Sequence, residues 1–110
     1  MKKLKLKQDK YRKTRGGYSR FLDIHCEKCA NFVALYQKDG PGPLKRMYLD
    51  RIFSPKYLAD LRDTPVKKLS NLICTRCRQV IGIPFIYQKE KRPAFRLFEG
   101  SVIKKLVRGV

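Results

Sequence analysis

The chain has 110 residues, of which 27 are lysine or arginine and nine are aspartate or glutamate, so its formal net charge is +18. This length corresponds to one domain with a small core, and no run of the sequence approaches the roughly 20 apolar residues that span a bilayer, so we expect a soluble protein. The charge exceeds what solubility requires and favours nucleic acid as the partner over an anionic membrane surface or an acidic protein.

Residues 1–17 form a basic arm that ends at the glycine pair Gly16-Gly17. Its apolar content is too small to offset the entropy of ordering, so we expect a flexible arm that becomes ordered along a nucleic-acid backbone, with a disordered solubilising tail as the alternative. No apolar run follows the initial charges as in a signal peptide, and we expect a cytoplasmic protein. The candidate contacts in the arm are Lys2, Lys3, Lys5, Lys7, Lys10, Arg12, Lys13 and Arg15.

The remainder, 18–110, is expected to be a single domain that begins with two strands. Alternating residues over 18–24 and the apolar run over 31–38 predict strands on either side of a cysteine pair. Residues 39–43 (DGPGP) predict a rigid turn. The segment 44–53 favours a strand, although its apolar spacing also fits a helix.

A helical segment near 54–69 is expected next. Ser54 can cap free amides and Pro55 suits a first helical position, so the pair predicts a short helix over 55–62. Asp63-Thr64-Pro65 either ends this helix or restarts a further turn through Lys68.

The C-terminal part predicts three strands. Ile81, Ile83, Phe85 and Tyr87 alternate within a strand over 79–87, in which Gly82 and Pro84 favour an edge or bulge. The expected order continues with a charged turn at 89–93, a strand over 94–98, a hairpin turn at 99–100 and a closing strand over 101–107.

All four cysteines lie in two Cys-x-x-Cys pairs, Cys26/Cys29 and Cys74/Cys77. Two such pairs can surround one tetrahedral metal ion, and structural zinc is the first candidate. The 44 residues between the pairs exceed the usual spacing of about 15 to 20, which indicates an inserted subdomain. A thiol-redox pair, a disulfide framework and buried thiols are the alternatives, and the pattern does not separate zinc from iron.

The two cysteine pairs also open similar segments, CEKCANFVA from Cys26 and CTRCRQVIG from Cys74. This repeat resembles the zinc-ribbon class, in which two knuckle turns at the ends of β-hairpins meet across one zinc. The resemblance covers about a third of the chain and implies metal ligation by the four cysteines. Because zinc ribbons are common in ribosomal, transcription and RNA-processing proteins, it also raises the expectation of a nucleic-acid partner.

His25, the single histidine, directly precedes Cys26. Four cysteines already fill a tetrahedral shell, so we expect His25 to be a strand residue or to hydrogen-bond near the site. A catalytic zinc keeps an open position with a base nearby, and neither is evident, so we expect no enzymatic activity.

Basic residues of the domain are interleaved with aromatic side chains. Arginine can bind phosphate or stack on a base, and exposed Tyr or Phe can stack on unpaired bases, although most of the aromatic residues are expected in the core. The candidate contacts are Arg76, Arg78, Lys89, Lys91, Arg92 and Arg96.

Together these features predict a small β-rich (α+β) zinc-ribbon-like domain with antiparallel hairpins, one short inserted helix and a basic N-terminal arm. We expect one structural Zn²⁺ and a non-enzymatic role in binding nucleic acid, with RNA, including ribosomal RNA, favoured over DNA. A ribonucleoprotein complex is the expected setting, with no membrane and no small-molecule substrate. The alternatives are a protein-interaction module or accessory factor of a ribosome or RNA polymerase, and a thiol-redox protein.

Overall fold

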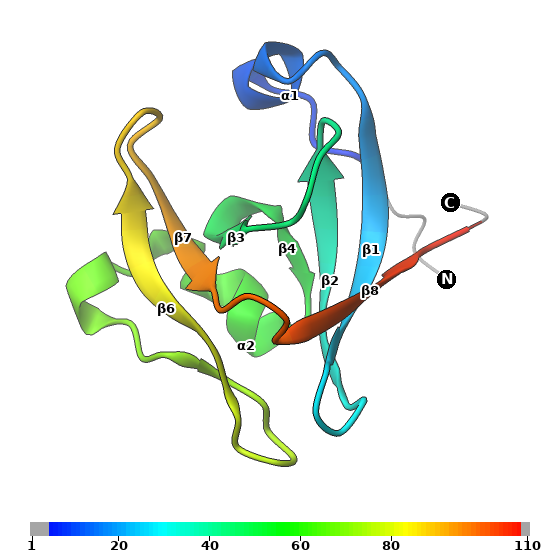
Figure 1. Ribbon diagram of the computed structural model, residues 1–110. Coiled ribbons are helices and arrows are strands. Elements are labelled where there is room, and N and C mark those ends of the chain that lie inside the picture. The colour runs from blue at the N-terminus through cyan, green and yellow to red at the C-terminus, as the bar shows by residue number, and fades with distance from the viewer. Residues whose placement is uncertain (1–4, 109–110) are drawn as a thin grey trace.

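The computed structural model describes residues 5–108, and these are mainly β-structure (Figure 1). Two short α-helices, α1 (Lys10–Thr14) and α2 (Lys56–Ala59), accompany 3₁₀ turns at Leu49–Arg51, Asp60–Asp63 and Val66–Lys68. The strands are β1 (Ser19–Cys26), β2 (Phe32–Asp39), β3 (Arg46–Tyr48), β4 (Ile52–Ser54), β5 (Leu72–Ile73), β6 (Val80–Tyr87), β7 (Arg92–Leu97) and β8 (Val102–Leu106). Within the described residues, no helix is long and apolar enough to cross a membrane.

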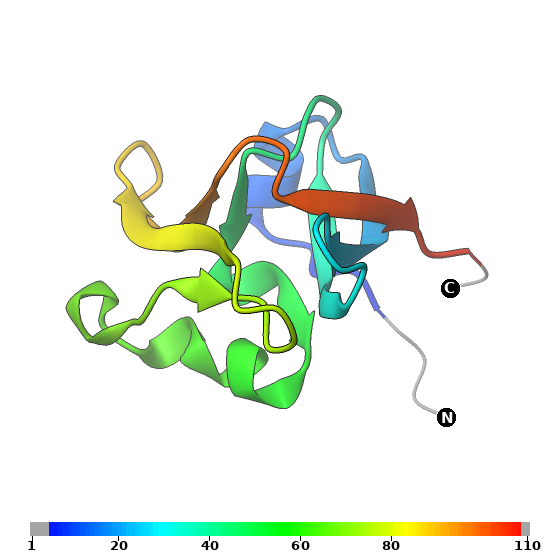
Figure 2. The ribbon, with the colours of Figure 1, turned by 60° about the horizontal axis from the view of Figure 1, so that its bottom comes forward.

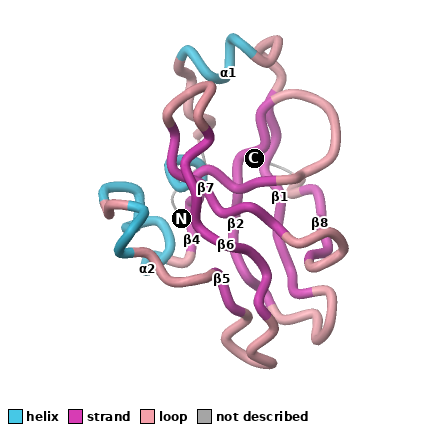
Figure 3. The backbone as a smooth tube through the Cα atoms, turned by 60° about the vertical axis from the view of Figure 1, so that its left-hand side comes forward, coloured by secondary structure: helices cyan, strands magenta, loops and turns pink. Residues whose placement is uncertain are grey.

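The strands form two four-stranded antiparallel sheets, in the orders β4-β2-β1-β8 and β3-β7-β6-β5. The chain passes from one sheet to the other four times, after β2, β3, β4 and β7. Figure 2 shows the helical segment around α2 beneath the strands, and Figure 3 shows α1 above the strands and α2 beside them. Each sheet is therefore completed only by strands that the chain reaches after it has passed through the other sheet.

The core lies where side chains of the two sheets meet. Ile24 and Tyr36 from the first sheet join Met47, Ile81 and Phe95 from the second, and each of these residues is almost fully buried. Since burial of such apolar side chains is the main favourable contribution to folding, this shared cluster holds the sheets together.

Several sequence predictions are confirmed. The strands expected over 18–24, 31–38, 79–87 and 94–98 correspond to β1, β2, β6 and β7, and the rigid turn at 39–43 joins β2 to the loop before β3. Gly40 and Gly42 in that turn have positive φ angles of 74° and 100°, which glycine adopts without steric cost.

The single strand favoured over 44–53 is wrong. The segment forms β3, which pairs with β7, and β4, which pairs with β2 in the other sheet. A 3₁₀ turn at Leu49–Arg51 separates them and buries Arg51 beside Asp39. The apolar pattern was compatible with a strand, but it contains no signal for this change of sheet.

The expected helix start is also corrected. Ser54 is the last residue of β4, paired with Leu35, and does not cap the helix. Pro55 instead precedes α2, and its carbonyl accepts hydrogen bonds from the amides of Leu58 and Ala59. The expected helical segment is present as α2 followed by 3₁₀ turns that end at Lys68.

Two details of the C-terminal strands differ from expectation. Residues 99–100 do turn the chain, but β8 pairs with β1 in the other sheet rather than with β7, so there is no hairpin here. In β6, Ile81 is fully buried while Ile83 is 39% exposed, so the expected apolar face is not continuous. The pairing of β5 with β6 is irregular between Val80 and Gly82, which agrees with the expected bulge. The alternative of an edge strand is wrong, because β6 lies between β7 and β5.

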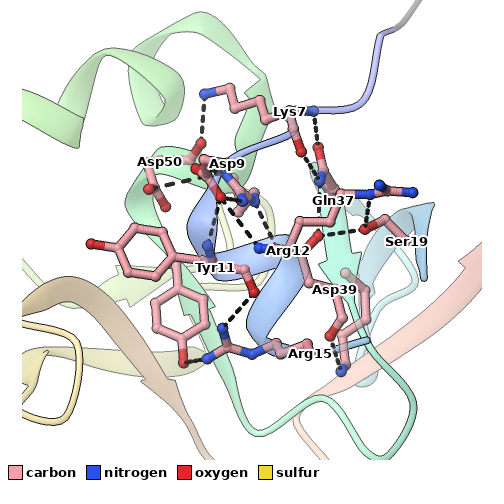
Figure 4. Close-up of polar contacts among 12 residues, drawn as sticks. Lys7, Asp9, Tyr11, Arg12, Arg15, Ser19, Gln37, Asp39 and Asp50 are labelled. Atoms are coloured by element: carbon pink, nitrogen blue, oxygen red, sulfur yellow. Dashed lines mark hydrogen bonds and ion pairs between the residues drawn. The ribbon is translucent and has the colours of Figure 1, made fainter. Parts of the chain in front are cut away.

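The described part of the basic arm packs against the body (Figure 4). Asp9 forms a two-pronged ion pair with Arg51, with N–O distances of 2.6 and 3.0 Å, and caps α1 through hydrogen bonds from the amides of Tyr11 and Arg12. The backbone of Lys7 exchanges two hydrogen bonds with the side chain of Gln37, and Arg15 pairs with Glu90. A detached arm would make none of these contacts. The domain boundary at residue 17 stays a prediction.

Charged partners hold Arg51 in place from both sides. Its side chain is 1% exposed, and its Nε lies 2.9 Å from Asp39, which also accepts hydrogen bonds from Ser19 and Gln37. The hydrogen bonds from Arg51 are the largest cause of the lowered pKa of Asp9, which falls to about 2. The arm is thus attached to a buried arginine that is itself fully paired.

We expect the replacement Arg51→Met to lower the free energy of unfolding by about 3–5 kcal/mol, because it leaves the buried Asp39 carboxylate unpaired. The matched control is Lys56→Met, which removes the same charge from an ion pair whose lysine is 87% exposed. That variant should change stability by less than about 0.5 kcal/mol. Urea unfolding of the metal-loaded proteins measures both values, and equal effects would contradict this role of Arg51.

Candidate metal centre and basic surface

Two β-hairpin ends bring the four cysteines together. Cys26 ends β1 and Cys29 lies in the turn before β2, whereas Cys74 follows β5 and Cys77 lies in the turn before β6. The first turn belongs to one sheet and the second turn to the other. The repeat seen in the sequence is therefore a repeat of two hairpin ends that face each other.

The two turns have the same hydrogen-bond pattern. The amide of Cys26 donates to the carbonyl of Asn31 and the amide of Ala30 donates to the carbonyl of Cys26, each at 2.8 Å. In the second turn, the amides of Cys74 and Arg78 donate to Gln79 and Cys74, each at 2.9 Å. The amide side chain of Asn31 also donates to the Thr75 hydroxyl, which links the two turns.

The sulfur atoms are arranged as ligands of one ion. The four Sγ atoms lie within 4.8 Å of one another, with 3.6 Å between Cys26 and Cys77 and 3.5 Å between Cys29 and Cys74. A tetrahedron with metal–sulfur bonds of about 2.3 Å has edges of about 3.8 Å. The predicted four-cysteine cluster is thus present, and its size and donor set suit a single metal ion such as zinc.

The turn also favours the thiolate form of its sulfur. Burial would raise the pKa of the Cys74 thiol, but hydrogen bonds from the backbone amides of Cys77 and Arg76, and contacts with the neighbouring sulfurs, lower it to about 6. Since metals bind the thiolate, this environment prepares the site for a cation.

His25 lies next to the cluster but takes part in other contacts. Its Nδ1 is 3.1 Å from the carbonyl of Ala30, and its ring meets the ring of Phe32 edge to face. It belongs to β1, as the sequence analysis expected for a strand residue.

We expect one zinc ion for each chain and loss of β-structure when a chelator removes it, because the site joins the two sheets. His25→Gln should retain the full metal content, whereas Cys77→Ala should lose metal and stability together. Elemental analysis and far-ultraviolet circular dichroism measure these outcomes. Two titratable dithiols with no bound metal in the folded protein would contradict the assignment.

The residue after each second cysteine adopts a left-handed conformation. Ala30 has a φ of 65° and Arg78 a φ of 68°, which strains a residue with a Cβ atom. We expect Ala30→Gly to raise the free energy of unfolding by up to about 1 kcal/mol. The control Ala34→Gly, at a buried position in β2, should lower it by about 1 kcal/mol; a loss of similar size in both variants would show that Ala30 is unstrained.

Some of the predicted nucleic-acid contacts lie in two separate regions. Arg76 and Arg78 are exposed at the second cysteine turn, together with Lys28 at the first. Lys89 and Lys91 are exposed in the turn between β6 and β7, at the other end of β6 (Figure 1). The structure therefore does not gather all of the predicted residues onto one patch.

The second region also receives the N-terminal arm. Lys10, Arg15, Lys89 and Lys91 line one hollow of about 680 Å³, which also borders α1 and the turn between β6 and β7. Lys5 and Lys13 are exposed elsewhere on the arm, and Arg96 is exposed on β7. Lys2 and Lys3 lie outside the described residues.

Four predicted contacts are engaged in internal interactions, and one of them is Arg15, which pairs with Glu90. Arg92 is 3% exposed and lies between the rings of Tyr11 and Tyr48, with its Cζ 4.0 and 3.7 Å from the two ring centres. It also pairs with Asp50 and Glu90. Arg12 donates to the Ser19 hydroxyl, and the Nζ of Lys7 donates to the carbonyl of Asp50. These side chains attach the arm and β7 to the body.

Sequence reasoning missed Lys45, Lys104 and Phe98. They lie respectively in the loop before β3, on β8 and in the loop after β7, and they line a common hollow. Lysines and a phenylalanine so far apart in the chain give no local pattern, and the passage of β8 to the other sheet brings them together.

No family model, curated protein or solved structure matches the chain. We therefore infer function from the metal centre, the surface charge and the shape of the surface.

Proposed function

We propose that this protein is a non-enzymatic, zinc-stabilised nucleic-acid-binding protein, with RNA favoured over DNA. The observation that carries the proposal is that four of the nine acidic side chains are paired with buried arginines, so that little negative charge offsets the exposed lysines and arginines. Asp9 and Asp39 are paired with Arg51, and Asp50 and Glu90 are paired with Arg92. These four acidic groups are neutralised by arginines of the same chain, while a large excess of lysine and arginine remains on the surface.

Exposed basic residues occur from the arm to β8 along the described part of the chain. Such a surface attracts a polyanion over a distance of about 10 Å at moderate salt and releases bound counterions when phosphates replace them. The exposed lysines and arginines are Lys5, Lys10, Lys13, Lys28, Lys45, Lys56, Arg62, Lys67, Lys68, Arg76, Arg78, Lys89, Lys91, Arg96, Lys104, Lys105 and Arg108.

In this proposal the zinc is structural. It fixes the two cysteine turns, so that Lys28 on one and Arg76 and Arg78 on the other are presented at a defined separation. No step of chemistry is assigned to the ion, because four thiolates would complete a tetrahedral shell and leave no position for a substrate.

The proposed setting is a ribonucleoprotein complex in a reducing compartment such as the cytoplasm. The four cysteines form no disulfide, and a reducing compartment would keep them available as metal ligands. Structured RNA, including ribosomal RNA, offers closely spaced phosphates to more than one basic region at once, which suits a surface with charge at both ends of β6.

We expect the affinity for nucleic acid to fall steeply with salt, with a slope of log K against log salt of about −0.9 for each phosphate contact on a duplex and about −0.7 on a single strand. The double replacement of Arg76→Gln and Arg78→Gln should make this slope shallower by the contribution of about two phosphate contacts, which is roughly 1.8 on a duplex. The control pair Lys67→Gln and Lys68→Gln removes the same charge from the inserted helical segment and should have a smaller effect.

Fluorescence anisotropy with labelled RNA and DNA at several salt concentrations measures these slopes. Purification without nuclease, followed by analysis of bound nucleic acid and metal, is the companion measurement. Affinity that stays constant between about 50 and 200 mM salt, or the absence of any binding, would contradict the proposed function.

A further inference from the structure

The loop after β7 forms one wall of a groove between the two sheets. This β7–β8 groove has a volume of about 830 Å³ and is lined by residues of β6, β7, β8 and the loop before β3. Its apolar lining includes Leu44, Ile83, Leu97 and Phe98, and Phe98 and Ile83 are 51% and 39% exposed. Large apolar side chains are therefore accessible inside a hollow of a highly charged protein.

Three basic side chains line the same groove. Lys45 comes from the loop before β3, Arg96 from β7 and Lys104 from β8, and all three are exposed. Glu99 is the single acidic residue of the lining. The groove thus combines an apolar surface with positive charge contributed by three separate segments.

The groove continues into two other hollows. Leu44 and Lys45 also line a hollow of about 320 Å³, which in turn shares Arg15 and Arg46 with the hollow beside α1. Nine basic and three acidic residues line the three hollows together. Asp39 is paired with Arg51, which is not among these nine basic residues, whereas Glu90 is paired with Arg15, which is one of them. The track therefore carries a clear excess of positive charge.

We propose that the β7–β8 groove binds a single strand of nucleic acid, with an unpaired base stacked on Phe98 and phosphates held by Lys45, Arg96 and Lys104. This inference rests on the proposed nucleic-acid function and specifies the form of the ligand. An unpaired base has a free face that can stack on an aromatic ring, whereas a duplex presents phosphates outward and keeps its bases stacked on one another. An exposed aromatic side chain within a basic groove therefore fits a single strand better than a duplex.

The length of the track supports the same ligand. Basic side chains continue from Lys104 through Lys45 and Arg46 to Lys89 and Lys91, which suits a flexible backbone that follows a surface over several nucleotides. An acidic peptide could also pair with these basic side chains through its carboxylates, and it is the competing ligand in the test below.

The test uses the full-length, zinc-loaded protein and measures anisotropy of labelled oligouridylate, oligothymidylate and a hairpin duplex. Phe98→Ala should weaken single-strand binding at least about fivefold and duplex binding by less than twofold. The control is Tyr57→Ala, which removes an aromatic side chain that is 55% exposed on α2 and lines none of the three hollows. It should leave binding of both ligands unchanged.

Adjacent lysines of β8 provide a second comparison that does not depend on Phe98. For single-strand binding, Lys104→Gln should make the slope of log K against log salt shallower by about 0.7, the contribution of one phosphate contact. Lys105→Gln removes the same charge from the next residue, which does not line the groove, and should leave the slope nearly unchanged. Circular dichroism and metal content confirm that all four variants remain folded.

The possible failures are distinguishable. Normal single-strand binding by Phe98→Ala, or equal slopes for the two lysine variants, overturns the groove assignment while leaving nucleic-acid binding intact. If the wild-type protein binds none of the nucleic acids, the proposed function fails as well. An acidic Tyr-containing peptide that binds the wild type more tightly than oligouridylate, and loses this binding in Phe98→Ala, would assign the groove to a protein partner instead.

Discussion

The architecture depends on the approach of four sulfur atoms from two different sheets. Each cysteine turn is held by its own hairpin, and the sulfurs meet across the gap between the sheets at distances of 3.5 and 3.6 Å. Four thiolates at that separation repel one another unless a cation lies among them. A metal ion bound among them would remove this repulsion and join the sheets at one end, while the apolar cluster around Met47 and Ile81 joins them in the middle.

A second constraint acts at the opposite end, where charge is neutralised within the protein. Arg51 and Arg92 are both buried, and they take their partners from the arm, from β2 and from the turns before β4 and β7. High net positive charge destabilises a compact state through self-repulsion, and pairing with acidic groups offsets part of it. Pairing two arginines in the interior provides specific attachment points for the N-terminal segment.

The sequence predicted those parts of the structure that depend on neighbouring residues. The paired cysteines, the longer strands and the turn at 39–43 carry local patterns, and each of these is present. The change of sheet at Leu49–Arg51, the destination of β8 and the docking of Asp9 on Arg51 depend on contacts between residues that are far apart in the chain. The surface groove around Phe98 could not be predicted for the same reason, because three separate segments form it.

The four passages of the chain between the sheets have a consequence for folding. Neither sheet is made from a continuous stretch of sequence, since each takes strands from both the N-terminal and the C-terminal half. One sheet therefore cannot unfold as an independent unit while the other stays intact. Opening of the protein should thus be cooperative, with amide protons of β1 and β6 exchanging at similar, slow rates. Formation of the native state should be slow for its size, because distant segments have to pair early.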